Sequence, residues 1–238
     1  MRERNALAIV VMLATASALS ACMPGAGPTA SPSSSATDSA MPTPTPSPTP
    51  DVPVAASVAI SAEAIAVLDA AGAPIATFDY FQPTADVVAG LSEHLGAPVD
   101  TPYTGGLESP PGVNHDWGGL RLIDNDAPVS APYYGDHWVI VTGPDANGLP
   151  VGTPAGIGTT GGVHVGDALS AVTIGAEPPV DTLDSLGGRP LAYFRVGLLP
   201  LPPGGEYGDA PNLGITIVGY TESDTVQRFI APSRNWGP

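Results

Sequence analysis

The sequence predicts an α+β fold, mainly antiparallel sheet with two short helices, preceded by a signal peptide and a disordered linker. Three observations lead to this expectation. From about residue 54, short apolar stretches rich in valine and isoleucine recur, as strands require. Two other segments predict helices, one by the helical spacing of its apolar residues and the other by a residue suited to cap a helix. Glycine and proline, with 29 residues each, separate the stretches and keep every element short.

The first expected elements are strands, two of which form a hairpin. Residues 57–61 and 64–68 are short apolar stretches and should each be a strand. The turn sequence Asp69-Ala70-Ala71-Gly72 follows the second of them. Residues 74–78 should therefore return beside 64–68 as the other strand of a hairpin.

A helix is expected over 85–95. Thr84 is a suitable N-cap, and Gly96 lies where a glycine commonly ends a helix. One face of the helix should pack against the sheet, because its apolar residues recur at helical spacing. These residues are Val87, Val88, Leu91 and Leu95.

Further strands are expected along the rest of the chain, where short apolar runs continue between turn residues. They lie at 117–123, 137–142, 162–165, 191–199, 214–220 and 225–231. A second helix of one or two turns should follow Asp167, as its N-cap, and end at Val172.

A weak internal repeat indicates two related halves. At an offset of about 81 residues, Pro98-Val99-Asp100-Thr101 recurs as Pro179-Val180-Asp181-Thr182, and Gly105-Gly106 matches Gly187-Gly188 within a residue. The halves would span about 54–135 and 136–238. Each would hold a hairpin, a capped helix and further antiparallel strands.

The N-terminal residues show the parts of an export signal. Arg2 and Arg4 precede an apolar run over 6–18, which is shorter than the roughly 20 residues of a membrane span. Leu19-Ser20-Ala21-Cys22 follows and resembles the bacterial lipobox. The resemblance implies cleavage after residue 21 and lipid attachment to the Cys22 thiol. An ordinary secretory signal is the alternative, but Cys22 is the only cysteine in the chain.

The residues after Cys22 predict a tether and then one domain. Residues 22–52 consist mostly of proline, serine, threonine and alanine, a composition that favours a disordered, extended chain. At about 3.1 Å per residue, such a tether could reach about 90 Å. A globular domain at 53–238 would follow it. With Cys22 carrying lipid, that domain has no thiol for disulfides or thiol chemistry.

The charge of the mature chain limits its partners. Removing residues 1–21 leaves five arginines, no lysine and 22 carboxylates, a formal balance of −17. Such a chain should not bind nucleic acid, and anionic lipids should repel it. Contact with the membrane would therefore depend on the lipid at Cys22. We expect the protein on the extracytoplasmic face of the cell membrane, where a cell-wall or envelope protein could be its partner.

The general plan resembles that of uncharacterised lipoproteins of high-GC Gram-positive bacteria. After the lipobox and tether, the resemblance depends on Phe78-Asp79-Tyr80-Phe81, His115-Asp116-Trp117-Gly118-Gly119 and Gly166-Asp167. The order of a strand at 163–165, Gly166-Asp167 and a short helix is similar to the α+β repeats of beta-lactamase-inhibitor-like proteins. Neither resemblance implies an activity or a functional residue.

Catalytic motifs are missing, and two His/Asp triplets are the nearest substitute. No lysine is present for a Schiff base or a Ser-Lys mechanism. His115-Asp116-Trp117 and Asp136-His137-Trp138 are near mirror images. Imidazole and carboxylate groups can bind zinc or act as a base with its orienting partner. The alternative is ordinary turn aspartates and edge histidines, so no cofactor or metal is expected.

Most aromatic residues are expected to fill the core, with one exception. Tyr133 and Tyr134 lie between Pro132 and Gly135 in a loop, where exposed rings can stack on sugars or receive a protein. They are the candidate binding residues.

Three functions remain open at this stage. The leading one is a non-catalytic binding or scaffolding domain of a lipid-anchored envelope protein. The second is an envelope hydrolase that uses His115, Asp116, Asp136 and His137, with or without zinc. The third is an inhibitor-like module that binds a protein partner through a sheet face lined by aromatic residues.

Overall fold

The computed structural model describes residues 53–105, 110–125, 128–172, 180–184, 190–203 and 211–235. The export signal, the lipobox and the tether lie outside the described residues. So do Gly106, Pro179 and Gly187-Gly188 of the expected repeat.

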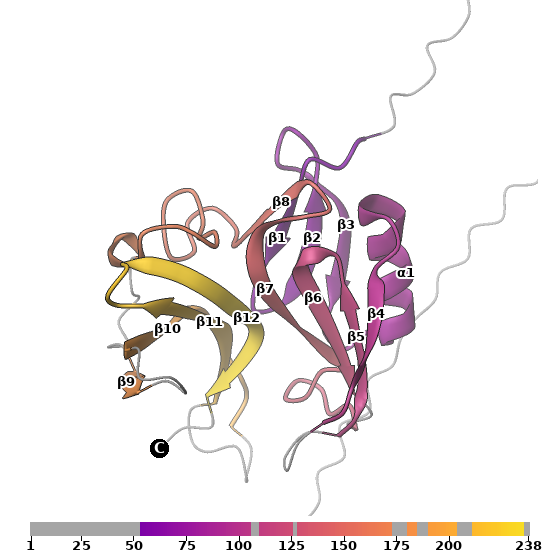
Figure 1. Cartoon of the computed structure of the whole chain (residues 1–238). Helices are drawn as coiled ribbons and strands as arrows, with labels where there is room; N and C mark the ends of the chain where they lie inside the picture. The colour runs from indigo at the N-terminus through magenta and orange to yellow at the C-terminus, as the bar shows by residue number, and fades with distance from the viewer. Residues whose placement is uncertain are drawn as a thin grey trace, which may run out of the picture. The chain divides into compact units, whose positions relative to one another are not determined.

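The described strands form one twelve-stranded sheet, and one α-helix accompanies it (Figure 1). The helix is α1 (Thr84–Leu95). The strands are β1 (Ser57–Ile60), β2 (Ala64–Leu68), β3 (Pro74–Asp79), β4 (Val99–Tyr103), β5 (Gly112–Asp116), β6 (Gly118–Asn125), β7 (His137–Ala146), β8 (Leu149–Gly152), β9 (Val180–Asp184), β10 (Pro190–Pro200), β11 (Asn212–Tyr220) and β12 (Thr225–Asn235).

Strand β7 is the point where three parts of the sheet meet. The main order is β3-β2-β1-β8-β7-β12-β11-β10-β9, and β6, β5 and β4 continue from the other side of β7. Residues 139–141 pair with both β6 and β12, whereas Asp145 and Ala146 pair with β8. The pairs between named strands are antiparallel except for β1 with β8, which is parallel and makes the sheet mixed.

The predicted α+β class with two short helices is wrong. Strands dominate the described residues, which contain one α-helix. The second predicted helix is only a single 3₁₀ turn, Leu169–Ala171. The turn between β11 and β12 takes the backbone N–H groups of this segment: Leu169 donates to the carbonyl of Asp224, and Ser170 donates to its carboxylate. These long-range bonds satisfy the first N–H groups of the segment, which no helix satisfies internally. Its local bonds, from Ala171 to Ala168 and from Val172 to Leu169, each span three residues, as in a 3₁₀ turn.

Two further expectations also differ from the structure. Residues 162–165 form no strand; instead the Thr153 hydroxyl accepts the N–H of Val163, and the Val163 carbonyl accepts the N–H of Thr153. The described residues of the second half do not show the order of elements that the repeat predicts. From β7 onward, the described residues contain no hairpin followed by an α-helix.

The hairpin of β2 and β3, strand β1 and helix α1 confirm the local predictions for the first half. The helix starts at Thr84, so Pro83 rather than Thr84 occupies the N-cap position. Gly96 ends the helix with a φ of 78°, a value that favours glycine. Strand β7 runs beyond the predicted 137–142 and turns at Asn147-Gly148, where both φ angles are positive, as in a type I′ hairpin.

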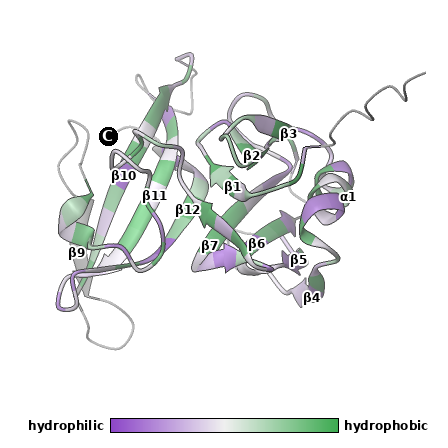
Figure 2. Ribbon diagram, turned by 90° about the horizontal axis from the view of Figure 1, so that it is seen from above, coloured by the Kyte–Doolittle hydropathy of each residue, from purple (hydrophilic) through white to green (hydrophobic). Residues whose placement is uncertain are grey.

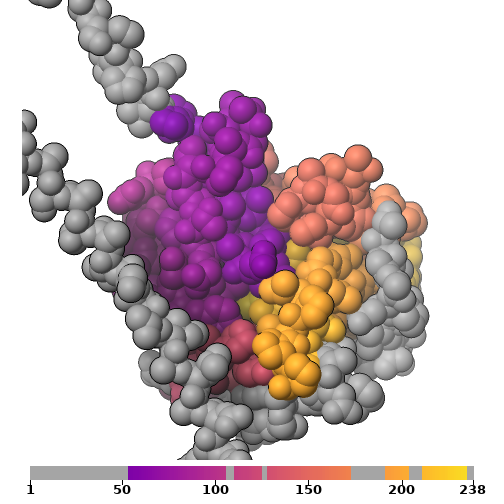
Figure 3. Space-filling model, turned by 180° about the vertical axis from the view of Figure 1, so that it is seen from behind, coloured from indigo at the N-terminus to yellow at the C-terminus, as the bar shows by residue number. Residues whose placement is uncertain are grey.

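The hydrophobic core lies between α1 with β1 and β2 on one side and the longer strands on the other. Val87, Leu91 and Leu95 are the buried apolar residues of the helix. The Trp117 indole is fully buried and donates its Nε1–H to the carbonyl of Gly96 at 2.8 Å. Figure 2 shows hydrophobic residues along the strands that meet in this core. Figure 3 shows the side on which β1–β3 and the 153–172 segment lie next to one another.

Candidate functional site

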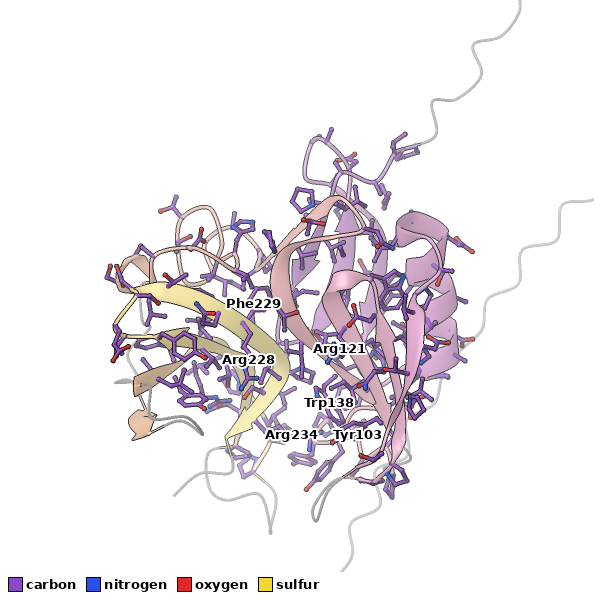
Figure 4. The ribbon with its side chains drawn as sticks, in the orientation of Figure 1. Tyr103, Arg121, Trp138, Arg228, Phe229 and Arg234 are labelled. Carbon is purple, nitrogen blue, oxygen red and sulfur yellow. The ribbon has the colours of Figure 1, made fainter. Side chains whose placement is uncertain are left out.

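The strands β4-β5-β6-β7-β12-β11-β10 form a continuous antiparallel run whose two faces differ. Val139 and Val141 of β7 are fully buried in the core. Trp138 and Ile140 alternate with them, so their side chains point to the opposite face. We call this opposite face the front face; Figure 4 labels Trp138, Arg121 and Arg228 among its side chains. Helix α1, with its buried apolar residues, packs on the core side.

The strand register places one row of side chains across the front face. Residues directly opposite one another in antiparallel strands have side chains on the same side of the sheet. The row runs through Asp116 on β5, Arg121 on β6, Ile140 on β7, Ile230 on β12, Thr216 on β11 and Arg195 on β10.

Neighbouring rows add aromatic rings and another arginine. Trp138 lies opposite Ile123, and the ring of Tyr103 meets the Trp138 ring edge-on, with 6.2 Å between the ring centroids. On the other side of the first row, Arg228 lies opposite Val218, which in turn lies opposite Tyr193. The rings of Tyr103, Trp138 and Tyr193 are half-buried, so part of each ring reaches solvent.

Each front-face arginine has a different environment. Arg121 donates from Nε and Nη2 to Oδ2 of Asp116 at 3.0 and 2.7 Å. Arg195 donates to the side-chain oxygen of Asn212 and to the carbonyl of Ser233. Arg228 is exposed and makes no hydrogen bond or ion pair with the described residues. The Arg228 guanidinium is therefore the one most available to a ligand.

Charge is unevenly distributed over the domain. The described rows of the front face hold three guanidinium groups and one carboxylate, that of Asp116, although the whole chain has a formal charge of −16. A fourth arginine, Arg234, lies over the ring of Tyr134, with its guanidinium carbon 4.1 Å from the ring centroid. The front face thus gathers cations that are scarce in the rest of the chain.

The predicted binding residues Tyr133 and Tyr134 are half-buried in the loop before β7. The Tyr133 hydroxyl donates to the carbonyl of Pro202 at 2.7 Å. The Tyr134 ring lies beneath Arg234. Tyr133 therefore connects this loop to the segment that follows β10, and Tyr134 connects it to β12.

The residues of the hydrolase alternative do not come together. His115 bonds Asp100 through Nδ1 at 2.7 Å, whereas Asp116, its neighbour in β5, points to the front face and bonds Arg121. The carboxylate of Asp136 accepts bonds from Thr84 at the start of α1. His137 is opposite Asp124, two residues along β6 from the position opposite His115. Asp136 and His137 both contact the hydroxyl of Thr84, whereas His115 and Asp116 bond to Asp100 and Arg121, so the four side chains do not form one site.

His137 is buried as a neutral side chain. Burial lowers the pKa of His137 to about 4, although the nearby carboxylates of Asp136 and Asp79 act in the opposite direction. Its ring lies 5.6 Å from the Tyr80 ring, and its Nε2 has no hydrogen-bond partner among the described residues. A neutral, enclosed imidazole of this kind is a structural residue.

The described part of the chain has neither a cluster of metal-binding side chains nor a helix that could span a membrane. No group of three or more His, Cys, Asp or Glu side chains in it could hold a metal ion. None of its helices is long and apolar enough to cross a membrane.

A cavity of about 470 Å³ lies between the 156–160 loop and Val196-Gly197 of β10. Glycine, threonine, isoleucine and valine line it, so it offers no titratable side chain. The front face, with its arginines and rings, has more chemistry for recognising a ligand.

Comparisons with protein-family models, curated proteins and solved structures find no match for the chain. A proposal about function therefore depends on the geometry of the described residues. Arg121, Arg195 and Arg228 were not predicted as site residues, although the sequence carries a signal for two of them. Leu120-Arg121-Leu122 and Phe194-Arg195-Val196 each place a charge between apolar residues, which marks the outer face of a strand.

Proposed function

We propose that the chain is a lipid-anchored protein of the extracytoplasmic membrane face and that its folded domain is a non-catalytic binding module. The front face is its binding surface. The observation that carries the proposal is the gathering of Arg121, Arg195 and Arg228 around half-buried aromatic rings on one sheet face of a strongly acidic chain. Arginine and aromatic residues are enriched at protein binding surfaces.

The anchoring part of the proposal is supported by Leu19-Ser20-Ala21-Cys22 and by the proline-rich residues that follow. A tether that can extend to about 90 Å would let the domain reach a partner well outside the membrane. The acidity of the domain opposes adsorption to anionic lipid, so its front face would be directed to the envelope rather than to the bilayer.

The test uses the mature chain with Cys22→Ser, which removes the lipid but keeps the tether and the domain. We would measure its co-sedimentation with isolated envelopes of the producing cells at physiological salt. Arg228→Gln should weaken binding by about fivefold, because loss of an interfacial charge commonly costs on the order of 1 kcal/mol.

The matched control is Ala70→Glu, which makes the same change in net charge at the exposed turn between β2 and β3. This control should bind like the parent. If Arg228→Gln and Ala70→Glu bind the envelopes equally well, or if neither binds, the front face is not the binding surface.

A further inference from the structure

The three front-face arginines are widely spaced. Arg121 and Arg195 lie in the same row on β6 and β10, four strand spacings apart, which corresponds to about 19 Å measured along the sheet. Arg228 lies on β12, midway between these strands and two residues along from the row. Its Cα is therefore about 12 Å from each of the other two.

The hydrogen bonds of the arginines hold their head groups at different places on the front face. Arg121 reaches toward Asp116 on β5, away from β12. Arg195 reaches toward Asn212 on β11 and Ser233 on β12, both of which lie toward the end of their strands away from Arg228. Because Arg121 and Arg195 are aimed at different partners and Arg228 lies between their strands, the three guanidinium groups do not converge on one small anion. A ligand with several anionic groups at intervals can contact all of them.

The surface between the arginines suits sugar rings. Ile140, Ile230 and Thr216 form the middle of the row, and the Trp138 and Tyr193 rings lie in the rows on either side. These side chains are half-buried and carry no charge. Aromatic side chains offer a rigid apolar face, on which the C–H face of a sugar can stack while its hydroxyl groups remain in water.

The strands that carry the arginines give little opportunity for an acidic peptide to bind through its backbone. β6, β12 and β10 are each paired with a strand on both sides. Their backbone groups are therefore used within the sheet and cannot add a further strand, the mode by which many sheets take up an extended peptide. Recognition on this face must depend on side chains.

We infer that the front face binds an acidic polysaccharide, a sugar polymer that carries carboxylate or phosphate groups at intervals. This inference rests on the proposed function and adds its ligand class. The negative charge of the whole chain does not prevent such binding, because charges are screened beyond about 8 Å at physiological ionic strength. The local cations then decide the interaction.

The experiment measures dissociation constants by calorimetry for the mature chain with Cys22→Ser at 0.15 M salt. Polygalacturonate supplies carboxylates, and dextran phosphate supplies phosphates. Neutral dextran supplies sugar without charge, and poly-L-glutamate supplies charge without sugar. Inorganic phosphate and monomeric galacturonate test whether one anionic group is enough. Circular dichroism of each variant verifies that it is folded.

Binding of polygalacturonate, dextran phosphate or both, with no binding of dextran or of the small anions, is the expected result. The arm that binds identifies the anionic group. Arg228→Gln and Trp138→Ala should each weaken the binding by about fivefold, and Ala70→Glu should not change it. Raising the salt concentration above 0.15 M should weaken glycan binding by the parent protein, because exposed charges contribute most of the attraction.

Two results would overturn the inference. Binding of poly-L-glutamate as tight as that of the acidic glycans would show that the ligand is an acidic peptide. Absence of binding to both acidic glycans would exclude this ligand class. In either case, envelope binding that is lost in Arg228→Gln would leave the proposed function standing.

Discussion

The carboxylate of Asp136 accepts hydrogen bonds from the backbone N–H and the hydroxyl of Thr84 at 2.7 and 3.0 Å. Thr84 is the first residue of α1, so a side chain from 52 positions further along the chain satisfies an N–H group that the helix itself leaves open. The negative charge is also favourable at a helix N-terminus.

Asp136→Ala should therefore destabilise the domain by about 1–2 kcal/mol, the usual cost of removing a helix cap. Urea unfolding followed by circular dichroism measures this change. Asp69→Ala is the matched control, because Asp69 also accepts two backbone N–H groups but in an exposed hairpin turn. If the two variants lose the same free energy of unfolding, the bonds from Asp136 to the helix stabilise the domain no more than the bonds of an exposed turn do.

The buried imidazole of His137 makes stability depend on pH. Its pKa is about 4 in the folded protein and about 6.5 in the unfolded chain. Between these values the unfolded chain binds a proton that the folded protein does not, so stability should fall as the pH decreases from 6.5 to 4. The loss should approach about 3 kcal/mol at the lower end.

The variant His137→Phe isolates this contribution from that of the carboxylates. Urea unfolding of parent and variant at pH 7.5, 6 and 5 should show a smaller loss of stability for the variant. Parallel curves for the two proteins over this range would contradict a neutral, buried His137.

The backbones of β6 and β7 approach closely at Gly119 and Gly143. A methyl group on Gly119 would lie 2.2 Å from the carbonyl oxygen of Asp145 and 2.8 Å from the Cα of Gly143. Backbone atoms cannot move aside as a flexible side chain can, so Gly119→Ala should cost about 2–3 kcal/mol. Gly161→Ala is the control, since that position has open space and a negative φ. Thermal unfolding should show a lower Tm for Gly119→Ala only.

Replacement of Cys22 tests the proposed anchor in cells. Cys22→Ser should leave the protein unprocessed or release it to the medium, because the acidic mature chain has no electrostatic attraction to the membrane. Fractionation and mass spectrometry of the N-terminal peptide provide the measurement. A variant that is cut after residue 21 and still sediments with membranes would disprove the lipid anchor.

Local patterns in the sequence were enough to predict the first half of the fold. The hairpin of β2 and β3 and the helix α1 depend on apolar spacing and on turn residues that lie within the same segment. The second helix could not be excluded in this way. Its Ser170 N–H bonds to Asp224, a residue 54 positions away that no local pattern connects to it.

The same limit applies to the front face. Leu120-Arg121-Leu122 shows that Arg121 points away from the core. That Arg121 and Arg195 share a row depends on the pairing of β7 with β12, strands far apart in the sequence. The four residues of the hydrolase alternative do not form one site, for a related reason. Consecutive residues of a strand point to opposite faces, so His115 and Asp116 cannot act together.

The position of β7 determines how the domain should unfold. Its residues 139–141 are bonded to β6 on one side and to β12 on the other, and its end is bonded to β8. Neither half of the sheet can detach without breaking the bonds of this strand, so the halves should melt in one cooperative transition. Amide hydrogens of Val139 and Val141 should exchange with solvent only on global opening, and they would report the full free energy of unfolding.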